Sequence, residues 1–175
     1  VPEILYHWRD LPSSTAANPE SKPYAQTAGL NAIQEHLDRV YGKGAATANE
    51  TENLFVYDVR YHMNEEPKVS IIIPIKDHAD LLKAAIDSIY AKTTYKNFEI
   101  ILIDDASPND SVSQLQDKLP PNTVFLPQQE NVGFAAANNI GMRRALDDGC
   151  DFALLLNNDT AVRPDFLEKL LAETP

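Results

Sequence analysis

The sequence predicts an α/β fold in which a parallel sheet carries helices on its flanks. Short apolar runs, typical of buried strands, alternate with segments whose apolar residues recur every three to four positions, as in helices. The strand-like runs are Val69–Ile75, Phe98–Ile103, Thr123–Leu126 and Phe152–Leu156. Since these runs are almost wholly apolar, we expect both faces of the sheet to be covered. We expect helices near residues 78–91 and 133–147, with Asp77 as N-cap of the first, and a third that begins at Pro164.

Residues 1–67 have a less regular pattern and are expected to form a small α+β segment before the main domain, which spans residues 68–175. The expected elements are strands at Val1–Arg9 and Leu54–Tyr61, a loop at 10–24, an amphipathic helix at 25–41 and a polar connector at 43–52. The chain begins at Val1 and stops just after a helical pattern. We therefore expect it to be part of a longer protein that has been cut at both ends.

Composition excludes several classes of function. The formal charge is −11, from 26 acidic and 15 basic residues, which disfavours binding to a nucleic-acid backbone. Cys150 is the single cysteine, so no internal disulfide can form and a reducing compartment fits best. No apolar run approaches the length of about 18 residues that a transmembrane helix needs. We expect a cytoplasmic location, with the inner face of the membrane as a further option for the full-length protein.

Polar residues follow three of the predicted strands at their carboxyl ends. Asp77 closes the first, Asp104 and Asp105 the second, and Asn157–Asp159 the last. Because parallel strands end at one edge, where open α/β sheets bind ligands, the four carboxylates should gather on one side of the sheet. A divalent cation would relieve their mutual repulsion. Each motif taken alone could also be only a hydrogen-bonded turn or a helix cap.

The distribution of glycine excludes two common phosphate sites. No glycine lies between Gly44 and Gly133, so the first strand of the main domain is not followed by Gly-x-Gly-x-x-Gly or by a P-loop. Phosphate is therefore not held by a glycine-rich turn. A nucleotide site assisted by a metal ion becomes the favoured prediction.

Motifs in residues 68–175 follow one another in a specific order. They are Val69–Pro74, Ile100–Ser107, Asn131–Gly141, and Leu154–Thr160 with Arg163–Asp165. Together they resemble family 2 glycosyltransferases, and the Asn-Asn-Asp triplet is similar to the rhamnosyltransferase-like branch. The resemblance implies the Rossmann-like, nucleotide-binding half of a GT-A fold. It also implies inverting transfer from a nucleotide-diphosphate sugar to a glycan or lipid-linked acceptor, with Mg²⁺ or Mn²⁺, in bacterial surface-polysaccharide synthesis.

The resemblance also implies roles for individual residues. The donor nucleotide, UDP- or dTDP-linked, would contact Pro74, Ile75, Lys76, Asp77, Asp104, Asp105, Gly133, Asn138 and Asn158, and the metal would contact Asp159 and Asn157. Asp77 would lie near the nucleobase, and Asp105 would contact the base or ribose. Two residues depart from the family pattern, because Asn157 replaces an acid and Asn138 replaces an arginine found in many members.

The family places its acceptor site and general base after the segment that this chain contains. We therefore expect the chain to bind the donor nucleotide and to transfer nothing by itself. Residues 1–67 resemble, less specifically, the segment before such a domain in large bacterial proteins with tandem modules. Two alternatives remain open, a non-catalytic scaffold or interaction module and a sugar nucleotidyltransferase. The second would need a glycine-rich, basic loop where residues 76–79 read Lys-Asp-His-Ala.

Overall fold

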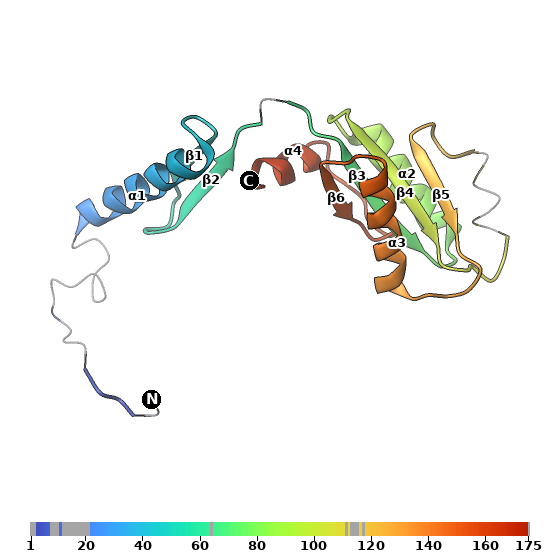
Figure 1. Cartoon of the computed structure of the whole chain (residues 1–175), viewed down its shortest axis with the longest axis horizontal. Coiled ribbons are helices and arrows are strands. Elements are labelled where there is room, and N and C mark those ends of the chain that lie inside the picture. The colour runs from blue at the N-terminus through green and yellow to red at the C-terminus, as the bar shows by residue number, and fades with distance from the viewer. Residues whose placement is uncertain are drawn as a thin grey trace. The chain divides into compact units, whose positions relative to one another are not determined.

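The computed structural model describes residues 3–7, 11, 22–63, 65–110, 112, 116 and 118–174. Contacts divide the chain into two compact units, one of Val1–Met63 with Leu171–Pro175 and one of Asn64–Leu170. Figure 1 shows the elements of both units. The domain boundary expected at residue 67 stays a prediction, because a division by contacts does not test independent folding. Among the described residues, no helix is long and apolar enough to cross a membrane.

The first unit packs one helix, α1, on a hairpin of two antiparallel strands. α1 spans Pro23–Tyr41, β1 spans Ala46–Glu50 and β2 spans Tyr57–Tyr61. The helix starts two residues earlier than expected, because proline fits the first helical turn, where its missing N–H is not needed. This unit confirms the predicted α+β character of the segment.

Two predictions for the first unit are wrong. The polar connector expected at residues 43–52 contains β1, whose Ala46 and Ala48 are buried. Small alanines between polar residues gave too weak an apolar alternation to indicate a strand. The strand predicted at Val1–Arg9 is irregular and exposed over residues 3–7, and its other residues lie outside the described ones. Of the loop expected at 10–24, only residue 11 and residues 22–24 are described, and the last two already belong to α1.

The second unit is built on a parallel sheet of four strands in the order β5-β4-β3-β6. In chain order its elements are β3 (Val69–Ile75), α2 (Ala79–Lys92), β4 (Phe98–Asp104), β5 (Thr123–Pro127), α3 (Phe134–Asp147), β6 (Phe152–Leu155) and α4 (Phe166–Ala172), of which the last two residues are assigned to the first unit. The predicted α/β class and the parallel sheet are confirmed. α4 begins at Phe166, so Pro164 precedes the helix and is not its first residue.

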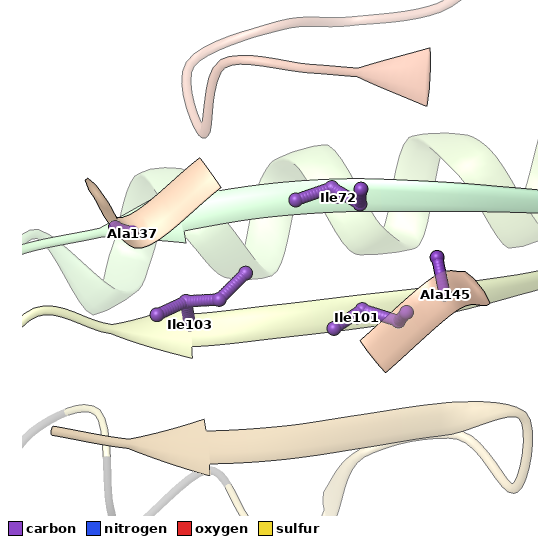
Figure 2. Packing of buried hydrophobic residues seen from close by; sticks show 5 residues of the cluster. All are labelled: Ile72, Ile101, Ile103, Ala137 and Ala145. Carbon is purple, nitrogen blue, oxygen red and sulfur yellow. The ribbon is translucent and has the colours of Figure 1, made fainter. Parts of the chain in front are cut away.

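The core lies on both faces of the central strands. Beneath α3, Ile72, Ile101 and Ile103 pack with Ala137 and Ala145 (Figure 2). The helix comes very close there, because a Cβ added at Gly141 would lie 2.4 Å from Ile72 Cγ2 and 2.8 Å from Ile103 Cδ1. The alternate strand residues face the other way, toward α2, which lies behind the sheet in Figure 2.

The edge strand β6 corrects the expectation that both faces of every strand are covered. Its residues alternate between half-buried and exposed, and Leu155 is 47% exposed. Leu155 pairs with Ile72 of β3 and so points to the face that α3 covers in the centre of the sheet. The helices of this unit shield the central strands β3 and β4 more fully than they shield this edge.

Candidate functional site

The strand order brings the predicted polar motifs to one edge of the sheet. The chain adds β4 and β5 on one side of β3 and then places β6 on the other side. The order therefore reverses between β3 and β6, and open α/β sheets bind ligands at such a point, outside the carboxyl ends of the strands. Ile75 at the end of β3 pairs with Asp104 at the end of β4. We call this region the carboxyl edge.

Asp77 lies in the turn between β3 and α2. Its Oδ1 atom accepts hydrogen bonds from the backbone N–H of His78 (2.9 Å) and from Asn109 Nδ2 (2.9 Å). These bonds, the one from Asn109 foremost, hold the pKa of the Asp77 carboxyl below its ordinary value. The N-cap of α2 is His78, without a side-chain cap hydrogen bond, so the prediction that Asp77 is the N-cap is wrong.

Asp104 is buried and holds the turn that follows β4. Its Oδ1 atom accepts hydrogen bonds from the backbone N–H of Ser107 (3.0 Å) and from Ser107 Oγ (2.6 Å). Ser107 Oγ in turn accepts the backbone N–H of Asp77 at 2.8 Å. The sequence motif included Ser107 but did not indicate that Ser107 and Asn109 hydrogen-bond to Asp77. The clue was the run of turn-forming side chains after Asp105, which hydrogen-bond readily to nearby backbone.

Asp105 joins the end of β4 to the start of α3. Its carboxylate accepts the backbone N–H groups of Val132 (2.6 Å) and Gly133 (3.0 Å), one on each oxygen, and its side chain is buried. Gly133 is the N-cap of α3 and has a φ of 82°, which favours glycine. Asp105 and Gly133 therefore fix the loop before α3, and their contact with a nucleotide stays a prediction.

Asn138 lies on α3 one turn after Gly133 and is only 3% exposed. Its Nδ2 group donates to the carbonyl oxygen of Phe134 at 2.9 Å. Its Oδ1 atom is buried and receives no hydrogen bond from the described part of the chain. A buried acceptor without a partner is costly, and because this atom has almost no exposed surface, a ligand could reach it only if the side chains that cover it moved.

The triplet Asn157–Asp159 follows β6 directly, beside β3. The backbone N–H of Leu156 still donates to the carbonyl oxygen of Ile72 at 2.9 Å, which extends the β3–β6 ladder to the residue before the triplet. The backbone N–H of Thr160 then donates to Asn157 O at 3.3 Å and closes a turn. Asn157 and Asp159 are exposed, and Asn158 is half-buried.

The expected grouping of four carboxylates around a cation is not found. Within the described ranges, no three His, Cys, Asp or Glu side chains come close enough to hold a metal ion together. Asp77, Asp104 and Asp105 each accept hydrogen bonds from neighbouring groups instead. Asp159 with Asn157 still offers exposed, hard oxygen ligands, which fit Mg²⁺ or Mn²⁺ when a diphosphate supplies further oxygens.

The remaining predicted residues contribute backbone and charge. Ile75 is buried, and its carbonyl oxygen accepts the N–H of Asp105 at 2.8 Å, whereas Pro74 is half-buried. Lys76 is exposed at this edge and forms no ion pair with the described residues. Arg163 is also exposed but lies away from this edge, because the carbonyl oxygen of the next residue, Pro164, accepts the backbone N–H of Thr94 between α2 and β4 at 3.0 Å. An open pocket beside the triplet is lined by Leu156, Thr160, Val162, Arg163 and Phe166, among others.

Comparison with known sequences identifies the family of the chain. A sequence model described as Glycosyl transferase family 2 matches residues 70–174. The chain is 33% identical over 175 residues to the O-antigen biosynthesis protein RfbC of Myxococcus xanthus, covering 99% of this chain and 13% of that protein. It is 32% identical over 176 residues to the uncharacterized protein y4gI of Sinorhizobium fredii, covering 98% of this chain and 19% of that protein. The chain thus spans less than a fifth of either relative.

Comparison with solved structures supports the fold. The mannosyltransferase PcManGT from Pyrobaculum calidifontis, in complex with GDP-Man and Mn²⁺, superimposes with a TM-score of 0.56 at 18% identity, over 85% of this chain and 41% of that one. Residues 1–349 of TarS from S. aureus, in complex with UDP, superimpose with a TM-score of 0.50 at 22% identity. That match covers 60% of this chain and 31% of the TarS chain.

Proposed function

We infer that this chain, which belongs to glycosyl transferase family 2, binds the nucleotide diphosphate of a sugar donor at the carboxyl edge. The observation that carries this proposal is the position of Asn157–Asp159, directly after β6 and beside β3, where the strand order reverses. The GDP-Man and UDP bound to the two solved structures of this fold support a nucleotide-linked ligand.

The nucleoside would lie near the ends of β3 and β4. Asp77 is the best-placed carboxylate for it, because both oxygens of Asp105 already accept backbone N–H groups. Asn138 would add an acceptor if the side chains that cover its Oδ1 atom moved, since this atom is buried and has no partner in the described structure. Both groups recognise hydrogen-bond donors, and the N–H and O–H groups of a nucleoside supply them. We propose a UDP- or dTDP-linked donor, following the similarity of the triplet to the rhamnosyltransferase-like branch.

The diphosphate would lie at the triplet. Asp159 and Asn157 would hold Mg²⁺ or Mn²⁺, which when bound neutralises the charge that develops on the departing diphosphate. The exposed side chain of Lys76 lies at the same edge and would lower its negative potential. Positive charge is needed here because the chain as a whole has a formal charge of −11.

For the whole protein we propose inverting transfer of the sugar to a glycan or lipid-linked acceptor in the synthesis of a bacterial surface polysaccharide. The name of the Myxococcus xanthus relative, an O-antigen biosynthesis protein, supports this class of product. We place the reaction in the cytoplasm. No described residue is assigned as the base that deprotonates the acceptor, so we expect this chain to bind the donor without transferring its sugar.

Isothermal titration calorimetry tests the proposal. UDP, dTDP and GDP are titrated with and without Mn²⁺ into the chain, into Asp159→Ala and into Asp147→Ala, which removes an exposed carboxylate at the far end of α3. We expect one nucleotide to bind more tightly with Mn²⁺, and this gain to disappear in Asp159→Ala only. Binding that ignores both metal and Asp159 would contradict the metal assignment. Absence of binding by every nucleotide would favour the scaffold alternative.

A further inference from the structure

Asp77 and His78 connect β3 to α2 in a backbone conformation that residues with side chains rarely adopt. Their φ angles are 64° and 56°, in the left-handed region where Cβ crowds the backbone. Such a conformation persists only where the surrounding contacts determine it. The groups that hold Asp77 therefore decide where its carboxylate lies.

Ser107 holds the backbone of Asp77. A serine hydroxyl has one proton to donate, and that of Ser107 goes to Asp104 Oδ1 at 2.6 Å. The Ser107 oxygen is then left as an acceptor, and it receives the backbone N–H of Asp77 at 2.8 Å. Asp104 is buried at the end of β4 and also accepts the backbone N–H of Ser107. Asp104 therefore fixes the orientation of the Ser107 hydroxyl.

Asn109 holds the side chain of Asp77. Its Nδ2 group donates to Asp77 Oδ1 at 2.9 Å, and the same oxygen accepts the backbone N–H of His78 at 2.9 Å. The other oxygen, Oδ2, receives no hydrogen bond from the described residues. One oxygen thus fixes the orientation of the carboxylate, and the other is left to accept a further hydrogen bond.

We propose that Ser107 and Asn109 are positioning residues that hold Asp77 so that its Oδ2 atom accepts a hydrogen bond from the donor nucleoside. The inference rests on the proposed function, because it requires a nucleotide at the carboxyl edge. The group recognised is an N–H or O–H of the base or ribose. Ser107 acts through the backbone of Asp77, and Asn109 acts through its side chain.

The first test measures the Kd of the nucleotide that binds best, by calorimetry, in Ser107→Ala and Ser107→Thr. Removing the hydroxyl should raise Kd about tenfold, and threonine should bring it back to within about threefold, because it keeps the hydroxyl. Ser70→Ala is the matched control. It also removes a serine-to-carboxylate hydrogen bond of 2.6 Å, to Glu99 at the other end of the sheet, and should leave Kd within about twofold.

The second test asks whether Ser107 acts through Asp77. In the background of Asp77→Ala, Ser107→Ala should raise Kd no further, because residues that act as one unit are not additive. If Ser107→Ala fails to fold, Asn109→Ala carries the same test. An unchanged Kd in Ser107→Ala, or an equal increase with and without Asp77, would overturn the inference and leave the proposed function intact. A chain that binds none of the nucleotides would overturn the proposed function, and this inference with it.

Discussion

The two ends of the parallel sheet use their charged residues differently. At the amino edge, where β3 and β4 begin, Lys68 Nζ lies 3.0 Å from Glu99 Oε2, and the other oxygen of Glu99 accepts the Ser70 hydroxyl. At the carboxyl edge, Lys76 forms no ion pair with the described residues. Charges satisfied within the protein stabilise it, whereas charges left unpaired are available to a ligand.

Backbone conformation separates the two ends in the same way. In the described part of residues 64–170, the non-glycine residues with positive φ are Asp77, His78 and Ala106. All three follow β3 or β4 at the carboxyl edge. Strained conformations of this kind concentrate at binding sites, where surrounding structure maintains them. Within the described part of this unit, the strained backbone is therefore confined to the carboxyl edge, and the amino edge has none.

The largest loss of stability is expected at Asp105, the carboxyl-edge residue whose charge is satisfied within the protein. This carboxylate lies at the carboxyl edge but has a structural role, since it accepts the backbone N–H groups of Val132 and Gly133. Asp105→Ala leaves both donors without a partner and should lower the free energy of unfolding by about 3 kcal/mol. Urea unfolding followed by circular dichroism measures this. Asp105→Asn, which keeps one acceptor oxygen, should cost less stability. Equal losses in the two variants would contradict the structural role of these two hydrogen bonds.

A somewhat smaller loss is expected at the amino edge. Glu99→Ala removes the partner of Lys68 and Ser70 and should lower the free energy of unfolding by about 2 kcal/mol. The cost stays below that of a fully buried pair because the Lys68 side chain is 29% exposed. Nucleotide affinity, measured by calorimetry, should not change. A large loss of affinity would show that the two edges are not separate in function.

Relief of strain should give a gain at the carboxyl edge. Ala106 has a φ of 54°, which glycine adopts without the cost of a Cβ, so Ala106→Gly should stabilise by about 0.5–1 kcal/mol. The control is Ala84→Gly at an exposed position of α2, which should destabilise by about the same amount. A higher Tm for Ala106→Gly together with a lower Tm for Ala84→Gly would support the strain at Ala106. A lower Tm for both variants would contradict it.

The smallest effect concerns the pKa of Asp77. Its carboxyl titrates below its ordinary pKa in the folded chain. The contribution of the ionised Asp77 to folding stability is therefore fully present above the pKa of this carboxyl in the unfolded chain. It is lost as the pH falls through the lower pKa of the folded chain. Asn109→Ala should raise the folded pKa toward the ordinary value, as an NMR titration of the Asp77 carboxyl would show. The stability difference between the two proteins should vanish in acid. Asn122→Ala, on the turn before β5, should leave the pKa of Asp77 unchanged.

Sequence reasoning found the elements with a strong apolar pattern and missed those without one. Val69–Ile75 has the predicted bounds because its almost wholly apolar run needs a buried strand. β1 was missed because its inward residues are alanines. At the site, strand ends identified the edge, but sequence alone does not say which groups a carboxylate binds. The Asp105 carboxylate accepts two backbone N–H groups of a loop, whereas one oxygen of Asp77 has no hydrogen-bond partner among the described residues, and only tertiary contacts separate the two cases.

Amide chemical-shift mapping by NMR shows directly whether a donor nucleotide binds at the carboxyl edge. The nucleotide that binds best in calorimetry is added with Mg²⁺, which is diamagnetic, to the ¹⁵N-labelled chain. We predict the largest shifts in residues 75–78, 104–107, 109 and 157–160, and small shifts around Lys68, Ser70 and Glu99 at the amino edge. Shifts centred on the amino edge, or on residues 22–63 of the first unit, would contradict it.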